Sequence, residues 1–237
     1  MATGARWATI TAMTTITGIR IRMARMTTID DLHLVQWLSP AFPIGSFAYS
    51  QGLETAIVDG EVRDAASLAD WVGNVLVHGS GRADAILLAA ARRPDADLTR
   101  LSDLALAYAT SAERATEMQE QGRAFLAQIR PITGRDLPDM PLAVAVGAAT
   151  AGLSVPTEGV LALWLHGLAA QLVQAGVRFI PLGQSAGQAI LSGLATDIVA
   201  LAQEAAGLGP EDIGATTIGA DLAAMRHETL NVRIFRS

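Results

Sequence analysis

The sequence predicts an all-α protein that folds as a single compact domain of about nine or ten helices. Three observations support this class. Apolar residues from Asp30 onward recur at intervals of three and four, which is the spacing of one helix face. No segment shows a sustained two-residue alternation, and no Asn-Gly or Asp-Gly hairpin lies between β-branched runs, so strands are not expected.

Glycine and proline divide the first half of the chain into short helices. Tyr49, Leu53 and Ala56 follow one helical face, and Ser46 is expected to cap that helix. The expected helices cover residues 34–38 before Pro40, 49–57 with an end at Gly60, 68–76 with an end at Gly79, 83–93 with a stop at Pro94, and 98–108.

Longer helices are expected in the second half. Thr157 is expected to cap a helix in which Leu161, Leu165 and Leu172 share a face. Gly147 and Ala151, spaced by four, predict close helix packing, most simply within the core. The expected helices cover residues 112–129 with a stop before Pro131, 140–153, a stretch from 157 onward, 184–206 with an end at Gly207, and about 216–228.

The first 26 residues differ in composition from the rest of the chain. They lack acidic residues and carry four arginines, Arg6, Arg20, Arg22 and Arg25. Such a leader resembles a transit peptide in composition, and it is also typical of a disordered extension or of a start codon assigned too early. Met26 as the true start is the favoured interpretation, and the helical domain is predicted to span residues 27–237.

The composition excludes several kinds of chemistry. The chain has 237 residues, no cysteine and no lysine, so all 17 basic side chains are arginine. Without cysteine there is no disulfide, thiolate metal site or cysteine nucleophile, and without lysine there is no Schiff base or P-loop lysine. The net charge of −6 argues against a general nucleic-acid binder, which needs a basic surface.

A long uncharged stretch raises the question of membrane spans. Among residues 140–196 only Glu158 and Arg178 are charged. Three prolines interrupt the stretch, its apolar residues are largely alanine, and its four glutamines would be costly in lipid. The stretch is interpreted as the buried core of a soluble protein, and no membrane association is predicted.

No catalytic, cofactor-binding or metal-binding residue is predicted. The sequence contains no metalloprotease, calcium-loop, nucleophile-elbow or Walker motif, and its four histidines are scattered. His227 and Glu228 are adjacent, so they point to different faces of a helix. Glu113 and Glu117 lie one turn apart among arginines, which predicts a solvated helix face first and a docking surface second.

Three segments break the helical pattern and carry unusual residues. Residues 39–54 place two prolines and Gly45 in an extended turn between helices. Residues 181–188 place two glutamines one turn apart at a glycine-lined helix start, where they suit hydrogen bonding across an interface. Residues 225–237 interleave arginine with apolar residues, which predicts docking onto the body of the protein or onto another subunit.

The chain resembles the urease accessory protein UreF family in four stretches that occur in the family's order. They are SPAFPIGSFAYSQGLE, SAERATEMQEQGRAF, VRFIPLGQSAGQAIL and the terminal MRHET…RIFRS, and they extend the resemblance over residues 32–237. The resemblance implies an all-helical, cytoplasmic and usually homodimeric adaptor with no reaction of its own. It implies that the protein binds UreD (also called UreH), recruits the GTPase UreG and regulates its activity, so that nickel enters apo-urease.

The resemblance also marks residues that are predicted to bind these partners. They are Pro40, Pro43, Gly45, Ser46, Tyr49, Gly52 and Glu54 in the first motif, Pro181, Gly183, Gln184, Gly187 and Gln188 in the second, and Arg226, His227, Glu228, Arg233, Phe235, Arg236 and Ser237 at the end. The tail, with Arg233 and Phe235, is expected to dock near residues 39–54 and to help form the UreD-binding face.

Two other functions stay open at this point. One is a small helical enzyme that acts on an apolar substrate in a pocket lined by alanine and leucine. The other is a nickel carrier, against which the four scattered histidines and the missing cysteine argue. Purification together with UreD and UreG discriminates the adaptor from the enzyme.

Overall fold

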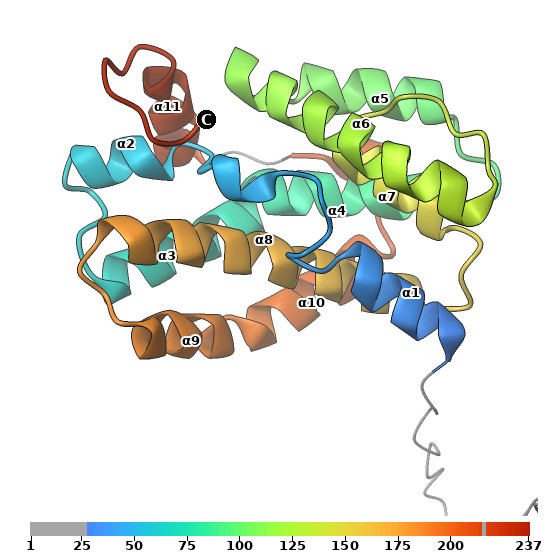
Figure 1. Ribbon diagram of the computed structural model, residues 1–237, viewed down its shortest axis with the longest axis horizontal. Helices are drawn as coiled ribbons and strands as arrows, with labels where there is room; N and C mark the ends of the chain where they lie inside the picture. The colour runs from blue at the N-terminus through green and yellow to red at the C-terminus, as the bar shows by residue number, and fades with distance from the viewer. Residues whose placement is uncertain (1–27, 215–216) are drawn as a thin grey trace, which may run out of the picture.

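Helices form all of the regular structure that is described. The computed structural model describes residues 28–214 and 217–237 and has no strand in these ranges, which confirms the predicted all-α class (Figure 1). The interpretations of residues 1–26 lie outside the described residues. In chain order the elements are α1 (Ile29–Trp37), the 3₁₀ helix η1 (Ser46–Ala48), α2 (Leu53–Val58), α3 (Ala65–His78), α4 (Ser80–Ala91), α5 (Leu98–Ala107), α6 (Ala112–Thr133), α7 (Leu142–Thr150), α8 (Thr157–Phe179), α9 (Gln184–Gly193), α10 (Ala195–Ala205), the 3₁₀ helix η2 (Pro210–Asp212) and α11 (Ile218–His227).

Several helices begin where the sequence supplies a capping side chain. Thr28 accepts a hydrogen bond from the backbone N–H of Asp31 ahead of α1, and Asp64 does the same for Ser67 ahead of α3. In both cases the side chain of the third helical residue accepts a hydrogen bond from the backbone N–H of the capping residue, which completes a capping box. Ser111 caps α6 through its hydroxyl. Local side chains therefore fix where these helices start.

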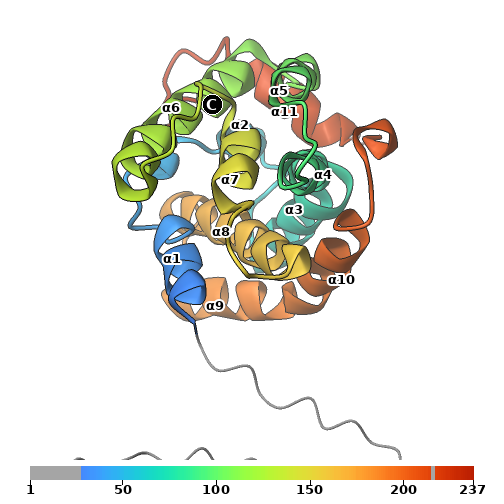
Figure 2. The same cartoon turned by 90° about the vertical axis from the view of Figure 1, so that its right-hand side faces the viewer.

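α7 and α8 occupy the middle of the bundle. Figure 2 shows them at the centre of the end-on view, with the other helices around them. Every residue of α7 is buried, and α8 packs against α2, α3, α4, α9 and α10. Because α7 consists mainly of alanine, valine and glycine, α4 and α6 are able to approach it closely from two sides.

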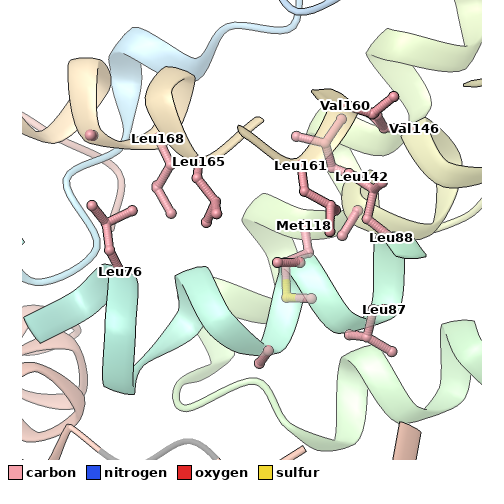
Figure 3. Close-up of a cluster of buried hydrophobic side chains, with 14 of the residues drawn as sticks. Leu76, Leu87, Leu88, Met118, Leu142, Val146, Val160, Leu161, Leu165 and Leu168 are labelled. Carbon is pink, nitrogen blue, oxygen red and sulfur yellow. The ribbon is translucent and has the colours of Figure 1, made fainter. Parts of the chain in front are cut away.

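The core is built from aliphatic side chains of α4, α7 and α8 (Figure 3). Leu88, Leu161 and Leu165 are fully buried there. Each such side chain gains about 1.5–3 kcal/mol on removal from water. Residues 140–196 supply α7 and α8, so the prediction that this uncharged stretch forms core is confirmed.

α8 also has the length and hydropathy of a membrane span. Among the described residues it is the single helix that meets both criteria. The pair α9 and α10, bent by 41°, would add a second span if the two helices crossed a membrane together. Half of the most apolar stretch of α8 is buried inside the bundle, however. The helix therefore has a place in a packed core, and the predicted lack of membrane association stays a prediction.

Two glycines allow helices to pack backbone against backbone. A Cβ atom on Gly147 of α7 would lie 2.5 Å from the carbonyl oxygen of Leu88 in α4. A Cβ atom on Gly122 of α6 would lie 2.0 Å from the carbonyl oxygen of Met140, just ahead of α7. Both distances are far inside van der Waals contact, so alanine fits at neither position unless backbone moves. The predicted role of Gly147 in core packing is confirmed.

Gly122→Ala is expected to lower the free energy of unfolding by about 1–3 kcal/mol, because the added methyl group pushes α6 away from the start of α7. Urea denaturation followed by circular dichroism measures this loss. Gly193→Ala is the matched control, since Gly193 is helical and exposed with nothing within 4 Å of its Cβ position. That substitution should raise the free energy of unfolding by up to about 1 kcal/mol. Equal effects of the two substitutions would contradict the packing explanation.

The expected helix stop before Pro131 is wrong. α6 continues through this proline and ends at Thr133, where Gly134 adopts a left-handed φ of 67° and its N–H bonds to the carbonyl oxygen of Arg130. Proline removes only one backbone donor here, in the last turn, and its ring is exposed. The glycine, rather than the proline, ends the helix.

The expected helix over residues 184–206 is also wrong, because the chain bends at Leu194 and forms α9 and α10 instead. Ile190 and Ile198 on the two sides of the bend are both buried. Gly193 weakens the helix immediately before the bend. The bend lets both halves bury an apolar face against α8, which one straight helix would not do as fully.

Two expected helix caps are not formed. Ser46 is the first residue of η1, and α2 starts only at Leu53, so the helix expected from Tyr49 is shorter. Thr157 is the first residue of α8 and accepts a hydrogen bond from Arg92 Nε at 3.3 Å, although its hydroxyl caps nothing. Each side chain follows a residue that already fixes the turn, a left-handed glycine in one case and a proline in the other.

Candidate partner-binding site

The end of the chain folds back onto the first motif. We call residues 39–54 the loop segment and residues 228–237 the tail. The N–H of Ser50 donates to the carbonyl oxygen of Ser237 at 2.7 Å, and the N–H of Arg236 donates to the carbonyl oxygen of Ala48 at 2.8 Å. Figure 1 shows the C-terminus beside α2 and α11. The predicted docking of the tail near the loop segment is confirmed.

Glu54 of α2 is the main acceptor for the tail. Its side chain is 3% exposed, and its two oxygens accept hydrogen bonds from the N–H groups of Ile234 at 2.9 Å and Phe235 at 3.0 Å. His227 Nε2 lies 3.1 Å from the same carboxylate. These three contacts satisfy the buried carboxylate, and through two of them Glu54 fixes the backbone of the tail.

His227 ends α11 between two carboxylates and is fully buried. Its Nδ1 lies 2.7 Å from Glu113 Oε2 at the start of α6, and the other oxygen of Glu113 pairs with Arg233 of the tail. Glu228 accepts a hydrogen bond from the N–H of Ala112 at 2.8 Å and so neutralises the positive end of α6. The end of α11 is therefore tied to both α2 and α6.

A buried ionic cluster lies under the last residue of the chain. Ser237 donates its hydroxyl hydrogen bond to Glu117 at 3.1 Å, and Glu117 pairs with Arg114 at 2.9 Å. Arg114 also pairs with Asp84 of α4 at 2.7 Å. Burial opposes the charge on Arg114, yet the two carboxylates outweigh it and raise the pKa of its guanidinium. Glu117 is 1% exposed, so the expected solvated face at Glu113 and Glu117 is wrong.

Tyr49 connects the loop segment to α6 and to the tail. Its hydroxyl donates to Glu120 at 2.7 Å, and the guanidinium of Arg236 lies 5.4 Å from the centre of its ring while also pairing with Glu120. Burial and the hydrogen bond to Glu120 raise the pKa of Tyr49. Hydrogen bonds from Tyr49 and Arg236 lower the pKa of Glu120. Contacts among these three side chains thus hold the tail, the loop segment and α6 together.

The structure divides the predicted partner-binding residues into buried and accessible groups. The buried ones are Tyr49, Gly52, Glu54, Gly187, His227, Phe235 and Ser237. The exposed or half-exposed ones are Pro40, Pro43, Gly45, Ser46, Pro181, Gly183, Gln184, Gln188, Arg226, Glu228, Arg233 and Arg236. Partner contact by any of them stays a prediction, and the buried group acts first within this chain.

The second motif, residues 181–188, is not part of the tail cluster. Gln184 and Gln188 are exposed on α9, and Gly187 packs against Val173 and Val177 of α8. The ring of Phe235 connects the two regions, because its centre lies 5.3 Å from that of Phe179 at the end of α8. The first motif and the chain end therefore form one site, and the second motif lies beside it.

Several residues of this site were not predicted, among them Glu120, Arg114, Asp84 and Gln121, whose side-chain amide donates to Glu117 at 3.2 Å. A signal for Glu120, Arg114 and Gln121 exists in the sequence, because α6 places them with Glu117 on neighbouring turns, opposite a tail with two arginines. Complementary charge between two remote segments indicates contact between them.

Six large apolar side chains are exposed on α11, on α2, which packs against α11, and on the tail. They are Ile218, Leu222 and Met225 of α11, Val58 of α2, and Val232 and Ile234 of the tail. The three residues of α11 recur at intervals of four and three and so share one helix face. Large exposed apolar groups that gather on one surface mark a site of interaction. We call these six residues the α11 surface.

A separate apolar groove of about 330 Å³ lies between α8, the loop segment and α1. Exposed Phe47 and Leu163 line it, and so do Trp37, Gln121 and Arg114, which are buried. The groove therefore reaches from the surface to the ionic cluster.

Among the residues described, no group of three or more histidine, aspartate or glutamate side chains is arranged to hold a metal ion.

Comparison with known proteins places the chain in a family. The UreF family model matches residues 62–195. A protein of Cereibacter sphaeroides named urease accessory protein UreF is 58% identical over 206 residues, which cover 87% of this chain and 98% of that protein. Proteins of the same name from Paracoccus denitrificans and Roseobacter denitrificans are 48% and 44% identical over 90% of this chain, and they are covered over 100% and 96% of their lengths. The chain therefore belongs to the UreF family of urease accessory proteins.

Proposed function

We propose that the protein is a cytoplasmic adaptor for nickel incorporation into apo-urease, with no catalytic reaction of its own. In this proposal it binds UreD (UreH) and the GTPase UreG, bridges them, and regulates the GTPase. Membership of the UreF family supports the accessory role. The partners come from the resemblance of its motifs to that family.

One observation carries the proposal for a docking site. The docked tail makes polar contacts with Glu54, Glu113 and Glu117, and it leaves Val232 and Ile234 exposed. We infer that these contacts order the tail and so hold its two exposed apolar side chains in place as part of the α11 surface. We assign the α11 surface to UreD.

We extend the proposal to a homodimer that forms over the groove of α8. No charged residue lies between Glu158 and Arg178 on this helix, and Leu163 and Phe47 are exposed at the groove. Two copies of a chain with a net charge of −6 repel each other least over a surface that carries few acidic groups, and the groove lining holds one acid, Asp84, beside Arg114 and Arg178. The mass of the purified protein in solution measures this association.

Leu222→Glu is expected to weaken UreD capture by about thirtyfold or more, because it places a charge at the centre of the α11 surface. Co-purification with UreD and UreG measures capture. Val199→Glu is the control, since Val199 is 49% exposed on α10, matching the 50% of Leu222, outside the α11 surface. Circular dichroism should show the same helix content for both variants. Full capture of UreD by Leu222→Glu would contradict the assignment of UreD to this surface.

The groove of about 330 Å³ also favours a second candidate, a small helical enzyme that acts on an apolar substrate. Urease activation in a strain that lacks this protein separates the two functions. Rescue by the wild-type chain, together with capture of UreD and UreG, supports the adaptor. Failure of both rescue and capture would favour the enzyme.

A further inference from the structure

His227 lies where its protonation decides how many hydrogen bonds it makes. Its ring is fully buried, with Nε2 3.1 Å from Glu54 Oε2 and Nδ1 2.7 Å from Glu113 Oε2. Ionised carboxylates only accept hydrogen bonds, so both contacts form only when both ring nitrogens carry a proton. A neutral imidazole makes one of the two bonds and turns a lone pair toward the other carboxylate.

The charges around the ring balance only in the protonated state. Glu54 faces it from α2 and Glu113 faces it from α6, while Arg233 of the tail pairs with Glu113. Glu228 points its carboxylate to the first N–H groups of α6 instead. Two carboxylates, one guanidinium and one imidazolium sum to zero. Loss of the histidine proton leaves a net negative charge in a site with little water to screen it.

The two carboxylates that face His227 are the ones that hold the tail. Glu54 accepts the N–H groups of Ile234 and Phe235, and Glu113 pairs with Arg233. Any displacement of either carboxylate therefore reaches residues 233–235 directly, without an intervening residue.

We propose that His227 is a proton-dependent latch for the tail. As imidazolium it fixes Glu54 and Glu113 where they bind residues 233–235, and on losing its proton it frees them. The tail is therefore seated while the ring is protonated and loosens when the ring is neutral, so that it loosens as pH rises. It follows, on the basis of the proposed function, that UreD capture weakens as pH rises.

The latch is tested on the full chain alone by NMR of the histidine rings and by amide hydrogen exchange, from about pH 5 to pH 9. We expect both nitrogens of His227 to be protonated where the amides of Ile234 and Phe235 are protected. Protection, corrected for the intrinsic pH dependence of exchange, should fall on the order of tenfold as the ring titrates, which corresponds to the loss of one charge-assisted hydrogen bond. A neutral His227 ring beside a protected tail would overturn the proposal.

Two variants separate the latch from other titrating groups. His227→Gln has no titrating group, so the protection of the two amides should no longer change with pH. His166→Gln, on the exposed side of α8, should keep the wild-type response. A pH response that persists in His227→Gln overturns the latch. If the tail of His227→Gln is unprotected at every pH, the wild-type protein supplies the test: the latch requires that the ring of His227 is protonated wherever the tail is protected.

UreD capture across the same pH series distinguishes the latch from the proposed function. A tail that loosens while capture stays constant supports the latch and contradicts the assignment of UreD to the α11 surface. No capture of UreD at any pH contradicts the proposed function and leaves the latch to be judged by the exchange data alone.

Discussion

Glu54→Ala is expected to release the tail and to lower the free energy of unfolding by about 3–5 kcal/mol. The substitution leaves buried His227 and the N–H groups of Ile234 and Phe235 without their acceptor. Removing one partner of a buried ionic group costs this much because the remaining polar groups stay desolvated and unpaired. Urea denaturation measures the loss, and hydrogen exchange at residues 234–235 reports the release of the tail. UreD capture should be lost in the same variant.

Glu61→Ala supplies the control for this prediction. Glu61 also bonds to α11, with 3.3 Å between its carboxylate and Arg226, but both side chains are about half exposed. An exposed ion pair contributes about 1 kcal/mol or less. The control should therefore keep a protected tail and full UreD capture. If Glu54→Ala were as mild as Glu61→Ala, the buried carboxylate would not be what orders the tail.

Most helices could be predicted because local signals and burial agree. Leu68, Val72 and Val75 of α3 follow one face, Asp64 caps its start, and the three apolar residues are all buried. The split at Leu194 could not be predicted in the same way. The apolar spacing is unbroken through this residue, and the bend is set by the surface of α8 against which both halves pack.

The docking of the tail could be predicted, whereas its acceptors could not. Exposed apolar residues and arginines at the chain end indicated a docked segment, and the structure confirms it. Glu113 and Glu117 follow the pattern of a solvated face, because acidic residues one turn apart usually face water. Glu117 is buried and Glu113 partly buried because the tail covers them, and the tail is remote in sequence from α6.

The tail cluster also depends on a close approach of α11 to α2 at Gly52, and Gly52→Ala should disrupt it. Gly52 has a left-handed φ of 82°, which costs an alanine about 1–2 kcal/mol. The added Cβ would lie 2.6 Å from the backbone nitrogen of Ala224 and 3.0 Å from its Cα. Overpacking of this kind costs about 1–3 kcal/mol more, because α11 backbone has to move. The expected total loss is roughly 2–5 kcal/mol in the free energy of unfolding.

Gly45→Ala isolates the conformational part of that loss. Gly45 has nearly the same φ, 73°, but nothing lies within 4 Å of its Cβ position. Its replacement should cost only the left-handed backbone energy of about 1–2 kcal/mol and leave the tail protected. In Gly52→Ala, by contrast, a displaced α11 carries His227 away from Glu54, so tail protection and UreD capture should fall together with stability. Equal losses for the two alanines, with a protected tail in both, would mean that α11 yields to the methyl group at little cost and that Gly52 serves the turn alone.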